Sequence, residues 1–251
     1  MSVLVVTGTD TGVGKTVVTA AVAALARTRG ASVAVVKPAQ TGVRPGMAGD
    51  LDEVRRLAGV TDLHEFARYA AALAPATAAR LAGLPPPDLA ACAEQIASLG
   101  RDLVIVEGAG GLLVRYDDEG ATLADLAHAL GAPMLVTVRS GLGTLNHTAL
   151  TLEAMAGRGV ELAGIVIGSW PRRPGLDDLC NVRDLETIAA RPLSGVLPER
   201  SGRLYGPEFL LTARDGLAPH LGGVFDPARF REDCHARTQT YGELTPREEE
   251  P

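Results

Sequence analysis

The hydrophobic positions of this 251-residue chain form short β-branched runs, separated by longer stretches rich in alanine and leucine. The short runs are apolar without alternation, which is typical of strands buried on both faces of a parallel sheet. They predict six strands, at residues 3–6, 33–37, 103–107, 134–138, 162–167 and 193–197.

The longer stretches predict helices between the strands. They cover residues 15–29, 50–57, 75–81, 88–99, 122–130, 144–158 and 177–190. Strands that alternate with helices favour a mostly parallel sheet. Right-handed crossovers then place helices on both of its faces, which gives a three-layer, doubly wound α/β fold.

The same pattern predicts one domain followed by a tail. No internal repeat or interdomain linker interrupts residues 1–225, and residues 85–87 (Pro-Pro-Pro) make a helix-breaking joint inside this domain. Residues 226–251 are polar and weakly patterned, and they end in Arg-Glu-Glu-Glu-Pro. We expect this segment to be a frayed, disordered tail.

Composition and charge narrow the function. Net charge is −6 with no long basic run, which argues against a nucleic-acid partner. No run approaches the ~20 apolar residues of a membrane span. The chain opens directly on a strand pattern, without a basic leader. Cys92, Cys180 and Cys234 are scattered and odd in number, as free thiols are in a reducing compartment. We therefore expect a cytoplasmic protein with no membrane contact.

A glycine-rich loop joins the first strand to the first helix. It runs from Gly8 to Thr16 and contains Gly12, Val13, Gly14 and Lys15, with Val17 following. Such a loop turns backbone N–H groups toward phosphate oxygens, while the lysine reaches the β- and γ-phosphates and the threonine hydroxyl binds Mg²⁺. The first glycine of the strict phosphate-loop pattern is Thr9 here. The strand–loop–helix context nevertheless predicts a P-loop NTPase-like nucleotide site.

Lysine is very rare in this chain. Of 24 basic residues only Lys15 and Lys37 are lysines. Lysine is a compact point charge and arginine a planar fork, so the two do not replace one another at a crowded anion site. Both lysines follow apolar runs that we expect to be adjacent strands. We therefore predict that both are catalytic and that Lys37 neutralises charge on a transferring phosphoryl group.

Carboxylates near the predicted strand ends suggest a metal site. Glu107 ends the strand at residues 103–107, and Gly108, Ala109 and Gly110 after it would let a ligand approach the backbone. Glu107 is the counterpart that Mg²⁺ needs opposite the loop threonine, Thr16. Asp50 has two interpretations: a second carboxylate on the metal, or the N-cap of the helix that starts there.

Another helix start lies far along the chain. Gly143, Thr144 and Asn146 open the helix predicted after the strand at 134–138. Exposed N–H groups there could hold a carboxylate, although every helix has such an end. His147 is better explained as a packed or interface residue.

Together these pieces resemble the dethiobiotin synthetases. The resemblance rests on the loop at 6–16, Lys37-Pro38 with Thr41-Gly42, the run at 106–111 and the run at 142–147, in an order that spans residues 1 to about 200. It implies an enzyme that uses a Mg²⁺-bound nucleoside triphosphate and CO₂ (or bicarbonate) to close 7,8-diaminononanoate into dethiobiotin. It also implies a carbamate and a carbamic–phosphoric anhydride as intermediates.

The resemblance further implies roles for individual residues. Thr11, Lys37 and Thr41 would bind the diamine end of the substrate. The enzyme would be a homodimer in which Gly143, Thr144 and Asn146 of the partner subunit hold the substrate carboxylate. The nucleotide would contact a larger set, formed by Gly12, Val13, Gly14, Lys15, Thr16, Val17, Asp50, Glu107, Gly108, Ala109 and Gly110.

The expected base-binding stretch departs from the family pattern. Members often have an adenine-contacting Asn after the strand at 162–167, where this chain has Gly168 and Ser169. We expect these two residues, with Val196, Leu197 and Pro198, to meet the base. The hypothesis that follows is a relaxed nucleobase preference, with ATP or another nucleoside triphosphate as co-substrate.

Two other functions share parts of this pattern. A nucleotide-switch ATPase of the septum-positioning type has the same fold, but it would need a basic or membrane-binding surface. Asp10 also stands where such proteins often carry a second lysine. An amide-forming ligase of the cobyrinate type would need a glutamine-hydrolysing domain, for which the chain after residue 200 is too short.

Overall fold

The computed structural model describes residues 1–244, with side chains through residue 240. Seven strands form one sheet, all of them parallel, in the order β4-β2-β6-β1-β7-β8-β9. Their bounds are β1 Ser2–Gly8, β2 Val33–Lys37, β4 Asp62–Glu65, β6 Leu103–Glu107, β7 Met134–Val138, β8 Leu162–Trp170 and β9 Gly195–Pro198. A two-stranded ribbon, β3 Gln40–Thr41 with β5 Arg68–Tyr69, lies outside this sheet.

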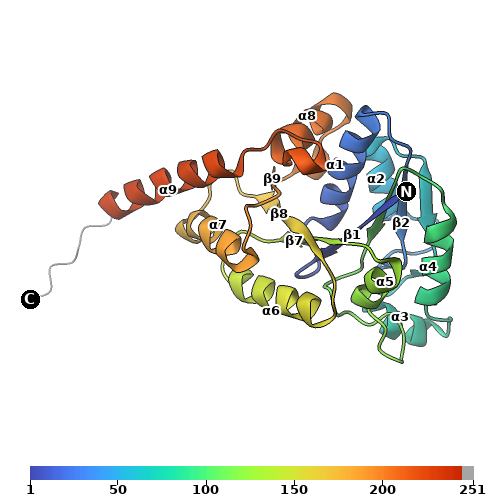
Figure 1. Ribbon diagram of the computed structural model, residues 1–251. Helices are drawn as coiled ribbons and strands as arrows, with labels where there is room; N and C mark the ends of the chain where they lie inside the picture. Colours follow the sequence, from blue (N-terminus) through green and yellow to red (C-terminus); the bar gives the residue numbers. More distant parts are fainter. Residues whose placement is uncertain (245–251) are drawn as a thin grey trace, which may run out of the picture.

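Nine α-helices accompany the sheet within the described residues (Figure 1). They are α1 Lys15–Thr28, α2 Asp50–Ala58, α3 Pro75–Ala82, α4 Leu89–Ser98, α5 Leu123–Leu130, α6 Thr144–Gly157, α7 Leu176–Ala189, α8 Gly206–Gly216 and α9 Pro227–Leu244. Two short 3₁₀ helices, η1 Ser201–Arg203 and η2 Pro219–Leu221, flank α8. The predicted fold class, a doubly wound mostly parallel sheet, is confirmed.

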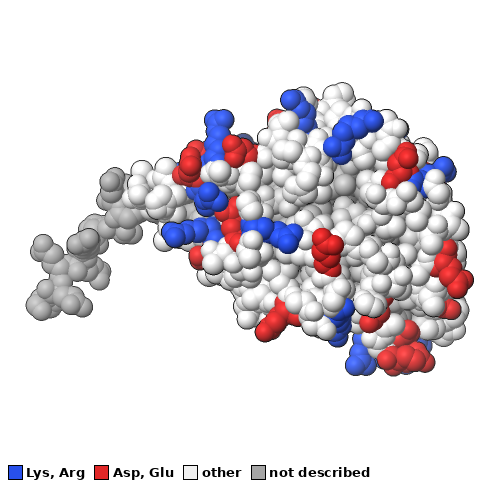
Figure 2. Space-filling model, viewed as in Figure 1, with Lys and Arg blue, Asp and Glu red and all other residues white. Residues whose placement is uncertain are grey.

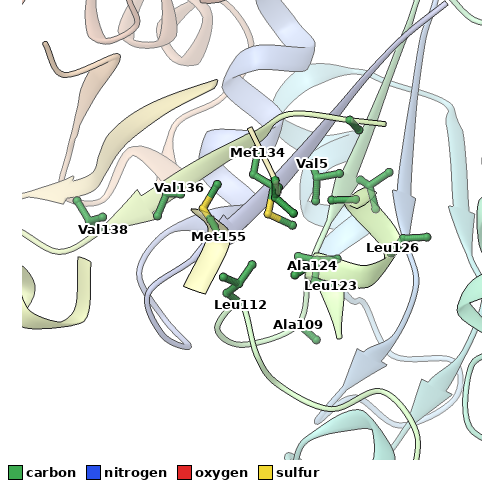
Figure 3. Close-up of a cluster of buried hydrophobic side chains, with 14 of the residues drawn as sticks. Val5, Ala109, Leu112, Leu123, Ala124, Leu126, Met134, Val136, Val138 and Met155 are labelled. Carbon is green, nitrogen blue, oxygen red and sulfur yellow. The ribbon is translucent and has the colours of Figure 1, made fainter. Parts of the chain in front are cut away.

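Two hydrophobic cores separate the three layers. Helices α1, α2 and α8 cover one face of the sheet, and α3 to α7 cover the other. Alternate residues of β1 belong to opposite cores. Val5 belongs to the core beneath α3 to α7, whereas Leu4 and Val6 belong to the core beneath α1, α2 and α8. Figure 3 shows the first of these cores, where Met155 of α6 meets Met134 and Val136 of β7. Alternation on a sheet buried on both faces gives the continuous apolar runs seen in the sequence.

The strand order corrects one expectation. The strands that precede Lys15 and contain Lys37 are not adjacent, because β6 lies between β1 and β2 and pairs with both. This insertion places Glu107, the last residue of β6, between the two lysines' strands. In a doubly wound sheet, the binding crevice lies outside the carboxyl ends of the strands, at the point where the strand order reverses. Here that point is at β1 and β6.

The prediction of a disordered tail is wrong for residues 227–244. This segment forms α9, which extends away from the body of the molecule (Figure 1). The ring of Phe230 packs against Trp170 and Phe225 at centroid distances of 5.1 and 5.5 Å. Cys234 is buried, and Arg231 pairs with Glu186 at 2.6 Å. The remaining residues of the predicted tail, 245–251, lie outside the described residues.

Candidate active site

A cleft of about 390 Å³ opens at the carboxyl ends of β1, β2 and β6. Both lysines line it, together with most residues predicted to bind nucleotide, substrate or metal. The lining residues are Thr11, Gly12, Gly14, Lys15, Thr16, Val17, Lys37, Gln40, Thr41, Asp50, Glu107, Ala109 and Gly110. Segments that lie up to about a hundred residues apart in the sequence thus meet in one cleft, as expected for the carboxyl ends of parallel strands.

The phosphate loop is shaped by close backbone packing. Gly14 has φ of 100°, a conformation that favours glycine, and it is the N-cap of α1. A Cβ on Gly14 would lie 2.7 Å from the carbonyl oxygen of Gly168, and one on Gly168 would lie 2.1 Å from that of Val13. Gly168 is therefore required by the packing of β8 against the loop. Within the described residues no side chain caps α1, so its first N–H groups remain available to an anion.

Lys15 lies in this loop with little access to solvent. Its ammonium donates a hydrogen bond to the backbone carbonyl of Asp10 at 2.9 Å. Burial, together with the positive charge of Lys37, lowers the pKa of Lys15 to about 8. A carbonyl dipole compensates a buried ammonium only partly, so a bound anion would stabilise the charged form.

Lys37 is fully compensated by the protein. Its Nζ lies 2.6 Å from Asp50 Oδ2 and 2.8 Å from Glu107 Oε1, and it donates to the carbonyl of Gly108 at 3.0 Å. Burial acts to lower the pKa of Lys37, but the two carboxylates outweigh it and hold that pKa above its usual value. Burial acts to raise the pKa of Asp50, but the charge of Lys37 outweighs it and holds that pKa below its usual value.

Three oxygen-bearing side chains meet beside Lys37. Thr16 Oγ1 donates to Glu107 Oε1 at 2.8 Å, and Asp50 shares Lys37 with Glu107. Glu107 Oε2 is buried without a hydrogen-bond partner among the described residues. A hydroxyl and two carboxylates, one of them with this unpaired oxygen, suit Mg²⁺, which uses one or two carboxylates and completes its shell with water and phosphate. Residues 1–244 contain no cluster of three or more His, Cys, Asp or Glu side chains able to hold a metal alone.

Asp50 is not the N-cap of its helix. The cap residue of α2 is Gly49, whose N–H donates to Asp52 Oδ2 at 2.8 Å. Asp50 is the first residue of α2, and its carboxylate pairs with Lys37. The N-cap interpretation is therefore wrong, and Asp50 lines the cleft, while its role as a metal ligand stays a prediction.

A second hollow of about 400 Å³ adjoins the phosphate loop on the β8 side. It is lined by Gly12, Val13, Arg139, Ser140, Gly141, Ser169, Pro171, Asp178 and Glu199. Ser169 therefore lies where a nucleotide held by the loop could reach it. The side chains of Val196 and Leu197 are instead buried in the two cores, and Pro198 is exposed. Neither hollow is lined by these three residues, whereas Glu199, which the sequence did not indicate, lines the second.

The start of α6 does not line the cleft. Thr144 is buried and donates from Oγ1 to the carbonyl of Arg139 at 2.7 Å, whereas Asn146 is exposed. Gly143 is the N-cap, and no side chain caps this helix within the described residues. Leu142, just before the helix, and Leu150, in its middle, are 88% and 56% exposed.

Sequence reasoning missed two polar residues at the phosphate loop and in the cleft. Arg139 donates to Asp10 Oδ2 and to the carbonyl of Thr11, both at 3.1 Å, and so ties the end of β7 to the crest of the loop. Gln40 is buried and lines the cleft. Gln40 lies within the Lys37–Gly42 run, and the only sign in the sequence that it belongs to the site is its position three residues after Lys37.

The remaining predictions concern surface and redox properties. All three cysteines are free thiols, with Cys92 and Cys234 buried and Cys180 exposed. No helix in residues 1–244 is long and apolar enough to cross a membrane. Basic and acidic side chains are interspersed on the face shown in Figure 2.

Comparison with known proteins identifies the relatives of the chain. A family model described as an AAA domain matches residues 2–202. The ATP-dependent dethiobiotin synthetase BioD of Parafrankia sp. is 63% identical over 233 residues, which cover 92% of this chain and 98% of the relative. The protein of the same name from Streptomyces avermitilis is 56% identical over 232 residues, with the same coverage of both chains.

Solved structures share the fold at low identity. The MinC:MinD cell division complex of Aquifex aeolicus matches with a TM-score of 0.51 and 15% identity, covering 100% of both chains. Chloroplast FtsY of Physcomitrella patens matches with a TM-score of 0.51 and 17% identity, covering 93% of this chain and 65% of that one. At such identity these two matches establish the architecture alone.

Proposed function

The chain belongs to the ATP-dependent dethiobiotin synthetase family, and from that premise we propose that it closes 7,8-diaminononanoate into dethiobiotin. The co-substrates are CO₂ and a nucleoside triphosphate, and the products are the cyclic urea, a nucleoside diphosphate and phosphate. One observation carries the proposal: Lys15 and Lys37, the only lysines, line one cleft together with Thr16, Asp50 and Glu107.

The chemistry needs two steps that share this cleft. First, one amine of the substrate adds CO₂ and loses a proton, and a carbamate oxygen attacks the γ-phosphorus as the nucleoside diphosphate leaves. Second, the other amine attacks the carbamate carbon, the C–O bond to phosphate breaks, and the new nitrogen loses its proton. Both steps develop negative charge on oxygen, which fixed ammonium groups stabilise.

The two lysines serve different oxygens in this scheme. Among the described residues, Lys15 has the carbonyl of Asp10 as its single hydrogen-bond partner, so its ammonium is free to turn to the β- and γ-phosphates. Lys37 is held at a fixed point by Asp50, Glu107 and the Gly108 carbonyl. Because the Lys37 ammonium already contacts three protein oxygens, it would act on the carbamate and the transferring phosphoryl group through its fixed positive charge, which needs no reorganisation during the reaction.

Thr16, Asp50 and Glu107 would hold Mg²⁺ beside the phosphates. When bound, the ion would neutralise charge on the phosphate oxygens. Thr11 and Thr41 line the same cleft and offer hydroxyl groups to the diamine end of the substrate. The base would extend toward the hollow that contains Ser169 and Glu199. ATP or another nucleoside triphosphate fits this arrangement.

The proposal includes a homodimer in the cytoplasm. Leu142, just before α6, and Leu150, in the middle of α6, are both exposed, and exposed apolar side chains on one element support an interface. In a dimer, the uncapped N–H groups near Gly143, Thr144 and Asn146 could hold the substrate carboxylate in the cleft of the partner subunit.

A comparison of activators tests this function. Nucleotide hydrolysis is measured with the purified protein in the presence of the diamine plus bicarbonate, DNA, anionic lipid vesicles or glutamine. We expect strong stimulation only by the diamine with bicarbonate. Stimulation by DNA or lipid would instead favour a nucleotide switch, and stimulation by glutamine an amide-forming ligase.

A further inference from the structure

Gln40 is a buried polar side chain that lines the active-site cleft and has no role in the chemistry above. It is 3% exposed and lies three residues after Lys37, in the short strand β3. A buried amide without partners is costly, so its hydrogen bonds show what it does.

The two ends of the Gln40 amide hold two different parts of the site. Oε1 accepts a hydrogen bond from the backbone N–H of Asp50 at 2.8 Å. Nε2 donates to the backbone carbonyl of Thr41 at 3.1 Å. One side chain thus bridges the first residue of α2, Asp50, and the next residue of β3, Thr41, and both of these residues line the cleft.

The surroundings of Gln40 fix its position. Its backbone N–H donates to the carbonyl of Ala67 at 2.8 Å, through the pairing of β3 with β5. A Cβ on Gly49 would lie 2.9 Å from Gln40 Oε1 and 3.0 Å from Arg68 Nη2. Arg68 in turn binds both oxygens of Glu65 and the carbonyl of Met47. The absence of a side chain at Gly49 therefore lets the Gln40 amide reach α2.

We propose that Gln40 is a positioning residue that sets Asp50, on the metal and phosphate side, relative to Thr41, on the diamine side. This inference rests on the proposed function for its substrate. The amide combines an acceptor for the Asp50 N–H with a donor for the Thr41 carbonyl on one long side chain. A carboxylate at this position keeps the acceptor and loses the donor, and a thioether loses both.

The test compares Gln40→Met and Gln40→Glu with the matched control Gln95→Met, which changes an exposed glutamine of α4. Four quantities are measured: turnover, the KM of the diamine, the KM of the nucleotide, and Mn²⁺ binding in the presence of a non-hydrolysable nucleotide, followed by electron paramagnetic resonance. Mn²⁺ stands in for Mg²⁺, and its binding does not depend on any reaction.

The proposal predicts a split between the two variants. Gln40→Met weakens Mn²⁺ binding and raises the diamine KM, each by about tenfold or more, as loss of a residue that orients a ligand does. Gln40→Glu retains Mn²⁺ binding and still raises the diamine KM. The nucleotide KM changes less than about twofold in both, because the phosphate loop is untouched.

Two results would overturn the proposal: Gln40 variants that match Gln95→Met, or variants that lose nucleotide binding to the same extent as the other quantities. If Gln40→Met does not fold, the split in Gln40→Glu decides. The two proposals can fail separately. If the wild type shows no diamine-dependent turnover, the proposed function fails. If Gln40→Met and Gln95→Met bind Mn²⁺ equally well, the role of Gln40 is refuted whatever the turnover.

Discussion

Lys15 and Lys37 are the same type of residue and line the same cleft, yet the regions around them differ. Lys37, at the end of β2, lies between two carboxylates whose ion pairs hold its pKa above the usual value. Lys15, in the loop after β1, has a backbone carbonyl as its partner, and burial beside Lys37 lowers its pKa to about 8. The protein compensates one cation itself and leaves the other for a ligand.

The two regions are also held in place by different forces. Hydrogen bonds from Lys37 to Glu107 and to the Gly108 carbonyl, together with the ion pair with Asp50, fix Lys37. The phosphate loop is instead held by contact between glycine backbones, with Gly14 against Gly168. A fixed positive charge suits the reacting centre. A lysine whose charge the protein compensates only partly, on a tightly packed loop, suits the binding of phosphate.

Removal of the Lys37 charge should have the largest effect. Lys37→Met would leave two carboxylates at a buried site without a cation, which we expect to lower the free energy of unfolding by ~3–5 kcal/mol. Turnover should fall at least ~100- to 1,000-fold, as after loss of a fixed transition-state donor. Chemical denaturation and steady-state kinetics measure the two effects.

A second substitution separates these two roles of Lys37. The double variant Lys37→Met with Glu107→Gln removes one buried negative charge, so it should regain part of the lost stability without regaining turnover. Lys37→Arg retains the charge but places a planar fork where a point charge lies, and it should also lose most turnover. Near wild-type turnover in Lys37→Arg would remove Lys37 from the mechanism.

The packing of the phosphate loop is tested by Gly168→Ala. The new Cβ would lie 2.1 Å from the Val13 carbonyl oxygen and 2.6 Å from the Thr137 side chain, so the loop must shift. We expect a loss of ~1–3 kcal/mol in the free energy of unfolding and a clear rise in the nucleotide dissociation constant, both measurable by calorimetry. Gly157→Ala is the matched control, because its Cβ would meet nothing within 4 Å. Equal behaviour of the two variants would show that this contact does not shape the loop.

The state of Lys15 predicts a dependence on pH. Its pKa is about 8 in the folded protein and 10.5 in the absence of structure. Between these values the unfolded chain binds the extra proton, so this lysine makes the free energy of unfolding rise with pH. Bound phosphate would restore the charged form. Nucleotide binding should therefore take up a proton above pH 8, and its affinity should fall there by up to about tenfold per pH unit.

Calorimetry in buffers of different ionisation enthalpy measures this proton uptake directly. The variant Lys15→Arg remains charged at every relevant pH and serves as the control. The uptake should vanish in it. Uptake of the same size in Lys15→Arg and in the wild type would assign the proton to another group.

The smallest effect is expected at the crest of the phosphate loop. The side chains of Arg139 and Asp10 are 55% and 52% exposed, and surface ion pairs contribute little to stability. Arg139→Ala should thus change the free energy of unfolding by less than about 1 kcal/mol, as measured by urea titration. A larger loss would mean that charged side chains, rather than backbone packing, hold this loop in place.

Much of the site could be predicted because strand ends are visible in the sequence. Lys37 and Glu107 each close a continuous apolar run, and parallel strands bring such ends to one edge. The order of the strands could not be obtained in this way, since no local pattern says that β6 lies between β1 and β2. The contact between Lys37 and Glu107 depends on that order, because β6 lies directly beside β2.

The missed features depend on contacts between distant segments. Helix α9 carries few apolar residues, and its packing rests on Phe230 against Trp170, sixty residues earlier in the sequence. Strand β4 is partly exposed at the sheet edge, so its sequence (Asp-Leu-His-Glu) lacks the apolar run of a central strand. Val196 and Leu197 were expected beside the base, but their apolar side chains gain more by burial in the cores.

The central claim is that the two lysines act on one carbamate and one triphosphate in a shared cleft. The most direct measurement incubates the protein with the diamine, the nucleotide, Mg²⁺ and carbon-13 bicarbonate, and follows phosphate and the ring product by nuclear magnetic resonance. The account predicts a labelled cyclic urea formed with one phosphate per ring, and neither in Lys37→Met. Phosphate release without a labelled ring, or release that does not require the diamine, would contradict it.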